Sequence, residues 1–200
     1  MKDQKKVIFV QGYGDYSDGV WPGWLEKELK KVGFDYLSIE IPDPMFPDIQ
    51  EWLRAMRRAE IIVDENTYFV GHSLGCMTIV RYLAGLDKKV KAGGCVFVAG
   101  FCEFPNFPLI GDFCALPLDW EQVKKRAREF FVVLSDNDTM VSVSSGQEFA
   151  KKLGAEVIIE KKKGHFKTDV KEIPSVLNAI LEMDQMREEL AEIKKLKTVK

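Results

Sequence analysis

The sequence contains few of the residues that bind metals or form disulfides. It has two histidines and four cysteines in 200 residues, and no two cysteines have the C-x-x-C spacing. The cysteines lie in apolar surroundings, so we interpret them as reduced core or pocket residues. The only imidazoles belong to His72 and His165, and no helical ligand spacing is present. We therefore expect neither a disulfide framework nor a metal site.

The chain also lacks an excess of one charge and a long apolar run. Lys and Arg total 29 against 31 Asp and Glu, which gives a net charge of −2. No global basic field is available to hold nucleic acid. The longest weakly polar run, 92–102, is shorter than the roughly twenty apolar residues that cross a bilayer. The N-terminus has no signal-peptide pattern. We expect a cytoplasmic protein with no nucleic-acid partner and no integral membrane association.

Apolar residues make up 46% of the sequence and charged residues 30%, which suits one globular domain with a sizeable core. Runs of β-branched or aromatic residues alternate with amphipathic segments, a pattern typical of a parallel sheet covered on both faces. We predict an α/β three-layer sandwich with about six mainly parallel strands. The strands are expected over 6–11, 35–41, 68–71, 90–99, 130–134 and 155–160, and the helices over 24–32, 48–59, 77–86 and 144–153.

After Pro174, apolar residues recur near helical spacing, and the chain ends in a lysine-rich stretch. We divide the chain into a domain over 1–182 and an amphipathic helical extension over 183–200. Fewer than three clean heptads are present, so the pattern does not specify a coiled coil. The extension is compatible with a homodimer contact and equally with a tail that packs on its own chain.

The pentapeptide Gly71-His72-Ser73-Leu74-Gly75 follows the apolar run 67–70 and precedes a helix-like stretch, 76–86. A Gly-x-Ser-x-Gly turn between strand and helix holds its serine on a sharp, strained bend and presents the hydroxyl to an open site. The Leu74 amide and the positive end of the helix dipole would face an oxyanion. The motif therefore indicates a serine hydrolase, although turns rich in small residues also occur without chemistry.

A serine nucleophile needs an imidazole as base and an acid to orient that imidazole. His72 adjoins Ser73 and should point away from its hydroxyl, so we choose His165, which follows the last predicted strand. The acid should come from the loop after the fifth strand. We choose Asp138 there, with Asp136 as the runner-up, because the Ser-x-x-Asp-x-x-Val pattern of 135–141 places the acid before the next helix. Either aspartate would also suit a plain turn.

The second oxyanion donor should come from the loop after the first strand, where Tyr13 lies between Gly12 and Gly14. We predict that the backbone amides of Tyr13 and Leu74 form the oxyanion hole. The two glycines would let that backbone approach a substrate closely, and they would equally suit any tight turn. The segment lacks the later glycine and lysine of a nucleotide-binding loop.

The segment 100–118 is rich in phenylalanine and proline and has no helical or alternating period. This composition predicts a long functional loop. Two interpretations stay open, a wall of the substrate site and an apolar cluster that covers the sheet edge. The candidate pocket residues are Trp21, Phe101, Phe104 and Phe107.

Together these residues resemble the retinoblastoma-binding serine hydrolase family, which is composed of compact α/β-hydrolases. The resemblance rests on Val7 to Gly12 followed by Trp21 and Trp24, the Gly71 to Gly75 turn, Ser135 to Asp138, and Gly164-His165-Phe166. It implies an α/β-hydrolase-like domain without a large cap and a triad of Ser73, Asp138 and His165. One departure is Gln11-Gly12, where such families usually carry His-Gly.

We therefore expect a serine hydrolase that cleaves small carboxylic esters, or thioesters or amides, through an acyl-enzyme, with a small acyl-containing substrate and no cofactor. A lipid-directed esterase is a narrower form of this hypothesis. The alternative from another class is a protein-interaction module that keeps a hydrolase scaffold with weak or no catalysis.

Overall fold

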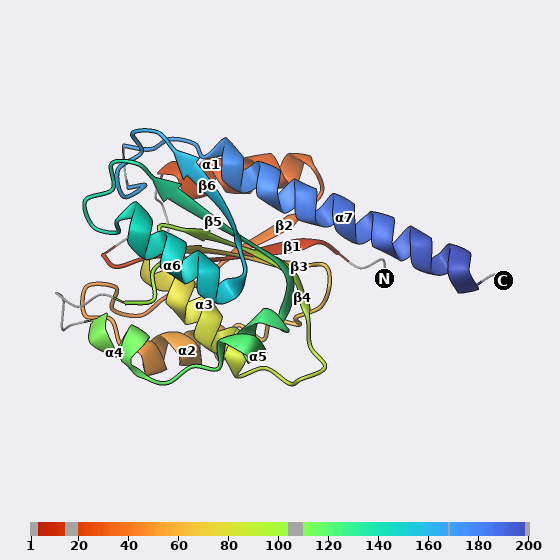
Figure 1. Cartoon of the computed structure of the whole chain (residues 1–200), viewed down its shortest axis with the longest axis horizontal. Helices are drawn as coiled ribbons and strands as arrows, with labels where there is room; N and C mark the ends of the chain where they lie inside the picture. The colour runs from red at the N-terminus through yellow and green to blue at the C-terminus, as the bar shows by residue number, and fades with distance from the viewer. Residues whose placement is uncertain (1–3, 15–19, 104–109, 168, 199–200) are drawn as a thin grey trace.

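Six parallel strands form one sheet in the order β2-β1-β3-β4-β5-β6. The structure, a computed structural model, describes residues 4–14, 20–103, 110–167 and 169–198. The predicted α/β sandwich of about six strands is confirmed (Figure 1). All six predicted strands are present, and the main difference in bounds is that β5 starts at Ala127, where it pairs with Ala92. The strands are β1 (Lys6–Val10), β2 (Asp35–Ser38), β3 (Thr67–His72), β4 (Ala92–Val98), β5 (Ala127–Ser135) and β6 (Glu156–Glu160).

Helices cover both faces of this sheet (Figure 1). Every residue of β3 and β4 is buried, as expected for central parallel strands between two helical layers. One face carries α1 (Val20–Lys31) and α7 (Pro174–Thr198). The other carries α2 (Ile49–Arg58), α3 (Leu74–Ala84), α4 (Gly111–Ala115), α5 (Trp120–Lys124) and α6 (Val143–Leu153).

The two-residue period of the strands divides the core into two clusters. In β1, Val7 and Phe9 pack into the cluster under α1 and α7, whereas Ile8 and Val10 pack into the cluster under α2, α3 and α6. Successive side chains of a strand point to opposite faces, so one apolar run supplies both layers. The sheet is thus buried on both faces, and the loops at the ends of its strands remain accessible for functional residues.

The predicted loop over 100–118 is partly helical, which corrects the sequence interpretation. α4 forms one short helix because Phe113 is buried against the Trp52 ring, at a centroid distance of 5.1 Å. Arg81 also fixes this turn, with Nε donating to the Phe113 carbonyl at 2.7 Å and Nη2 to the Leu116 carbonyl at 2.9 Å. These contacts come from distant parts of the chain, which explains why the local pattern showed no period.

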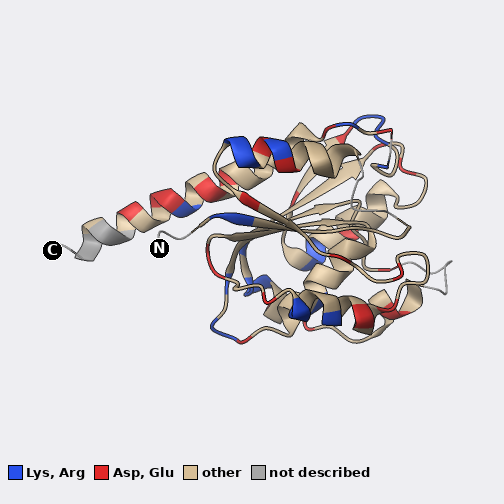
Figure 2. Cartoon of the chain, turned by 180° about the vertical axis from the view of Figure 1, so that it is seen from behind, with Lys and Arg blue, Asp and Glu red and all other residues tan. Residues whose placement is uncertain are grey.

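α7 runs without a break from Pro174 to Thr198, across the predicted boundary at residue 182. Beyond that position, Asp184 accepts hydrogen bonds from Lys5 and from the Tyr68 hydroxyl, so this part of the helix is still tied to the sheet. The last turns project from the domain and carry both acidic and basic residues (Figures 1 and 2). The domain division and the homodimer contact stay predictions.

Charged residues of both signs are interspersed over the outer helices, and the centre of the sheet is almost free of them (Figure 2). Within the ranges that the structure describes, no helix is both long and apolar enough to cross a membrane. The same ranges contain no group of three or more His, Cys, Asp or Glu side chains arranged to hold a metal ion.

Candidate active site

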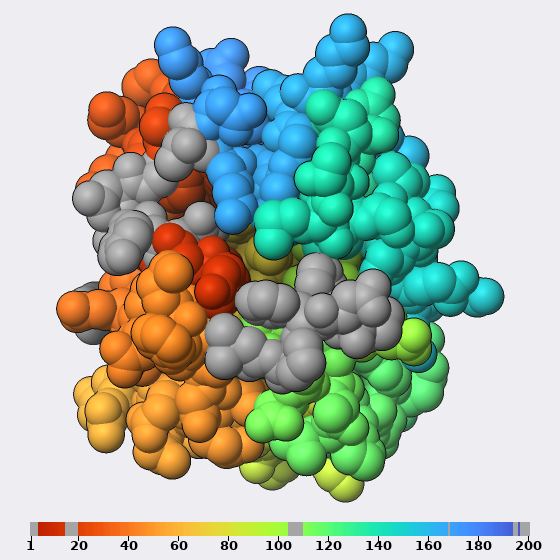
Figure 3. All heavy atoms as spheres, turned by 90° about the vertical axis from the view of Figure 1, so that its left-hand side faces the viewer, coloured from red at the N-terminus to blue at the C-terminus, as the bar shows by residue number. Residues whose placement is uncertain are grey.

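The three predicted triad residues lie in turns or loops at one edge of the sheet. All strands are parallel, so the loops that follow β1, β3, β4, β5 and β6 leave the sheet on the same side. Figure 3 views this edge, where the segment after β1 (red), the segment after β5 (teal) and the segment after β6 (blue) meet near the centre of the face. Residues far apart in the sequence are thus brought together.

Ser73 occupies a strained turn between β3 and α3. Its backbone has φ 52° and ψ −115°. Residues other than glycine rarely adopt such a positive φ. Its N–H donates to the Val98 carbonyl at 2.9 Å, which fixes the turn to β4. The bend presents the serine side chain at the sheet edge.

The two glycines of the turn are required by space. A Cβ on Gly75 would lie 2.1 Å from the Val10 carbonyl oxygen, and one on Gly71 would lie 2.8 Å from the Cys76 nitrogen. No other residue fits at these distances without a backbone shift. Gly75 thus lets the start of α3 rest directly on the end of β1, beside the loop that carries Tyr13.

His165 lies between Ser73 and Asp138. Its Nε2 is 3.0 Å from the Ser73 Oγ, and its Nδ1 is 2.8 Å from the Asp138 Oδ2. With the proton on Nδ1, the ring donates to the carboxylate and accepts from the serine hydroxyl. The His165 and Asp138 side chains are 6% and 2% exposed. The structure therefore brings the three predicted residues into one buried hydrogen-bonded chain.

The two aspartates of the acid loop have different partners. The second oxygen of Asp138 accepts from the Met140 and Val141 amides at 2.8 and 2.9 Å, which holds the carboxylate in place. Asp136, the runner-up, accepts instead from the Lys162 amide at 2.8 Å. Asp138 is thus the aspartate that faces His165, while Asp136 fastens one loop to another.

Further side chains tie the acid loop to the loop of His165. The Asn137 Oδ1 accepts from the Gly164 amide at 2.8 Å, and the Ser135 Oγ accepts from the Lys163 amide at 3.0 Å. Together with the contact of Asp136, these bonds hold consecutive amides just before His165. The sequence motifs gave no signal for this role, because these residue types also suit ordinary turns.

His72 supports the same loop from the opposite side. Its Nε2 lies 2.9 Å from the backbone carbonyl oxygen of His165, and because a carbonyl only accepts, this nitrogen is the donor. The two imidazole centroids are 5.2 Å apart. The sequence predicted no role for His72 beyond its place in the pentapeptide, and it did not predict this contact with the His165 carbonyl.

The electrostatic environment keeps His165 neutral and Asp138 ionised. Burial lowers the pKa of His165 below its ordinary value, the nearby His72 lowers it further, and the hydrogen bond to Asp138 only partly opposes this. For Asp138, burial would raise the pKa, but the His165 ring and the Val141 and Met140 amides outweigh it, so the pKa is lowered. A neutral imidazole beside an ionised carboxylate is the state that a general base requires.

The two predicted oxyanion donors belong to elements that meet near Ser73. Leu74 is the first residue of α3, so its amide has no partner within the helix and points out of the helix end. Tyr13 follows the end of β1, which touches the start of α3 at Gly75. Their role as oxyanion donors stays a prediction.

The predicted aromatic pocket residues divide into two groups. Trp21 and Phe101 are 2% and 1% exposed, and both belong to the hydrophobic core. Trp21 also donates from Nε1 to the Phe166 carbonyl at 2.8 Å, next to His165. Phe104 and Phe107 lie outside the described residues.

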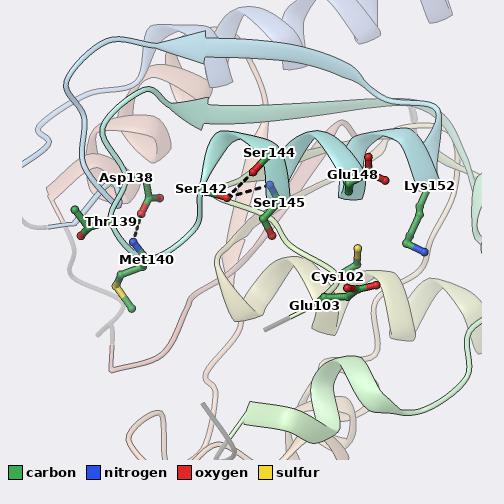
Figure 4. A pocket seen from close by; sticks show the side chains of 10 residues that line it. All are labelled: Cys102, Glu103, Asp138, Thr139, Met140, Ser142, Ser144, Ser145, Glu148 and Lys152. Atoms are coloured by element: carbon green, nitrogen blue, oxygen red, sulfur yellow. Dashed lines mark hydrogen bonds between the residues drawn. The ribbon is translucent and has the colours of Figure 1, made fainter. Parts of the chain in front are cut away.

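A cavity of about 820 Å³ lies beside Asp138 (Figure 4). It is bounded by the Asp138 loop, by α6 and by the residues Cys102 and Glu103, which follow β4. Trp21 and Phe101 are not among the described residues that line it.

The chain is similar to known hydrolases over most of its length. A family model described as "Serine hydrolase" matches residues 7–177. The putative hydrolase YdeN of Bacillus subtilis is 30% identical over 166 residues, which cover 82% of this chain and 87% of YdeN. The serine hydrolase RBBP9 of Rattus norvegicus is 28% identical over 188 residues, which cover 90% and 98% of the two chains. The crystal structure of the Bacillus subtilis ydeN product superposes with a TM-score of 0.87 at 28% identity, over 90% of this chain and 99% of that one.

Proposed function

This chain belongs to the serine hydrolase family, and from that premise we propose that it hydrolyses small carboxylic esters through an acyl-enzyme on Ser73. The family membership confirms the resemblance found in the sequence, and it supports a hydrolase. The ester bond and the catalytic roles of individual residues are our proposal.

In the first half of the reaction, Ser73 Oγ attacks the ester carbonyl carbon while His165 Nε2 takes the hydroxyl proton. The distance of 3.0 Å between the two atoms suits this transfer. The carbonyl oxygen becomes an oxyanion, which the Leu74 and Tyr13 amides stabilise. The intermediate then collapses, the bond to the alcohol breaks, and His165 gives its proton to the leaving oxygen.

In the second half, water attacks the acyl-enzyme carbonyl and gives a proton to His165. The new tetrahedral intermediate releases the Ser73 oxygen, which recovers the proton, and the carboxylic acid leaves. Asp138 stays ionised throughout, because its pKa is lowered, and it stabilises the imidazolium that forms twice per cycle. Thioesters and amides would follow the same steps with a thiol or amine as the leaving group.

The observation that carries this proposal is the position of His165, within hydrogen-bond distance of both Ser73 Oγ and Asp138 Oδ2. That order of nucleophile, base and acid is the arrangement that activates a serine. The strained turn at Ser73 adds support, since such strain is characteristic of the nucleophile in this fold.

The test combines covalent labelling with ester hydrolysis. We expect a fluorophosphonate probe to label wild-type protein at Ser73, as located by mass spectrometry, and p-nitrophenyl acetate to be hydrolysed. Ser73→Ala and His165→Ala should abolish both. Ser38→Ala, at the end of the edge strand β2, is the matched control and should retain both. No labelling of folded wild-type protein would contradict the proposal.

A further inference from the structure

We propose that the cavity beside Asp138 binds a positively charged group of the substrate, so that cationic esters are preferred to neutral ones of the same shape. This inference rests on the proposed function. It names the substrate class that the site takes.

The cavity has the size of a small-molecule subsite. Its volume of about 820 Å³ lies within the range of ligand pockets, roughly 300–1,000 Å³. The Asp138–Met140 segment closes one end, Cys102 and Glu103 lie opposite, and α6 forms the long wall (Figure 4). Two of these walls come from the loops after β4 and β5, and β4 also holds the Ser73 turn through the Val98 carbonyl.

One wall of the cavity includes a proposed catalytic residue, and another follows the strand that holds the Ser73 turn. Asp138 lies on its lining and contacts His165 at 2.8 Å. Cys102 lies shortly after Val98, whose carbonyl accepts the Ser73 amide at 2.9 Å. The cavity and Ser73 thus lie at the same edge of the sheet, with His165 joining Ser73 to the Asp138 wall.

The helical wall is held close to the sheet by two glycines. A Cβ on Gly146 would lie 2.1 Å from a Leu134 methyl carbon, and one on Gly100 would lie 2.5 Å from the Phe149 ring. Gly154 ends α6 in the left-handed conformation, with φ 68°. The wall is thus fixed by packing, as a specific subsite requires.

The lining combines apolar surface with polar groups, and most of its charged side chains are acidic. Its described residues include the hydroxyls of Thr139, Ser144 and Ser145 and the carboxylates of Glu103 and Glu148. In Figure 4, the Glu103 side chain and the Glu148 side chain extend from opposite walls. A ligand whose charged end contacts the carboxylates and whose alkyl part contacts the apolar surface would match this lining.

The carboxylates of the two glutamates are available to a ligand. Within the described part of the chain, neither Glu103 nor Glu148 forms a hydrogen bond or an ion pair with another side chain. Lys152 is the one cation on the described lining, and its ammonium lies 5.7 Å from the centroid of the Trp120 ring. Two carboxylates thus face one ammonium on this lining, and a cationic group gains attraction here.

The test uses two pairs of substrates matched in shape. One pair places the charge in the leaving group, acetylthiocholine against 3,3-dimethylbutyl thioacetate. The other places it in the acyl group, the p-nitrophenyl esters of 4-(trimethylammonio)butanoate and 5,5-dimethylhexanoate. We expect kcat/KM to be about fivefold higher for the cationic member of at least one pair at low ionic strength, as two partly exposed charge pairs would give.

The double variant Glu103→Gln, Glu148→Gln should remove that preference and leave the neutral member unchanged. Sodium chloride at 0.5 M should reduce the preference in the wild type, since salt screens exposed charges. Glu156→Gln is the matched control, because Glu156 is an exposed carboxylate at the start of β6, on the opposite edge of the sheet. It should retain the full preference.

Equal or faster turnover of the neutral members of both pairs would overturn the inference, and so would a double variant that keeps the charge preference or lowers both members alike. Fluorophosphonate labelling of Ser73 separates this failure from that of the proposed function. Normal labelling without charge preference rejects only the cationic subsite, whereas absent labelling of folded wild-type protein rejects the hydrolase mechanism itself.

Discussion

The His72 Nε2 lies 2.9 Å from the backbone carbonyl oxygen of His165. The residue before the proposed nucleophile thus binds the backbone of the proposed base, so that the turn at Ser73 and the loop after β6 hold one another at a fixed distance. A shift of about 1 Å between two reacting groups is enough to lower a rate about a hundredfold. This contact is therefore expected to serve catalysis through position, without touching the substrate.

His72→Ala should lower kcat/KM for p-nitrophenyl acetate about tenfold, because the loop of His165 loses one anchoring hydrogen bond. His72 also lowers the pKa of His165, so the acidic limb of the pH profile should move to higher pH in the variant. His72→Gln keeps a donor and should recover part of the rate. An unchanged rate and pH profile in His72→Ala would show that the contact has no positioning role.

The two aspartates after β5 should differ sharply in their effect on catalysis. Asp138→Asn should lower kcat about 10³- to 10⁴-fold, because the amide favours the wrong tautomer of His165 and cannot stabilise the imidazolium. Asp136→Asn should change kcat less than about tenfold, since its carboxylate accepts from the Lys162 amide and not from His165. Steady-state kinetics on both variants decide between them, and the reverse order would make Asp136 the catalytic acid.

The rate should depend on pH through the charge of His165. Only the neutral imidazole accepts the Ser73 proton, so kcat/KM should rise with pH and reach a plateau once His165 is deprotonated. Burial lowers the pKa of this histidine, so the midpoint should lie below the ordinary value of 6.5. A profile of kcat/KM from pH 4 to pH 8 measures it. A midpoint above 6.5 would contradict the environment that the structure gives to His165.

The sequence predicted the sheet and the three residues that meet in the site because both depend on local pattern and topology. Apolar runs such as 67–70 define central strands whose length and composition vary little between α/β folds. In a parallel sheet, the loops after successive strands leave at one edge. The spatial proximity of Ser73, Asp138 and His165 thus follows from which strands precede them.

The sequence did not predict the supporting contacts or the lining of the cavity. Phe101 was a candidate for a pocket wall, yet it lies in the core. The sequence could not separate the two positions, because a buried and an exposed phenylalanine in an irregular segment have the same local pattern. The hydrogen bond from His72 to the His165 carbonyl joins positions 93 residues apart. The sequence analysis gave the polar side chains of α6 no role, and it is the packing of α6 beside Cys102 that makes them part of a cavity lining.

The contact between Gly75 and the end of β1 gives a prediction about stability. A Cβ at this position would lie 2.1 Å from the Val10 carbonyl oxygen and 2.6 Å from that of Gln11, so Gly75→Ala must push α3 away from the loop of Tyr13. We expect the free energy of unfolding to fall by about 3 kcal/mol and the melting temperature by about 6–12 °C. Ester hydrolysis should be lost with the geometry of the turn.

Gly23→Ala is the matched control for this substitution. Gly23 lies in α1, where an added Cβ meets no atom within 4 Å, and alanine favours a helix over glycine by about 1 kcal/mol. Its melting temperature should stay level or rise, with activity unchanged. Thermal unfolding followed by circular dichroism compares the two variants. If Gly75→Ala melted with the wild type and kept its activity, α3 would not need to rest on the end of β1, and the spatial reason for glycine in this turn would be wrong.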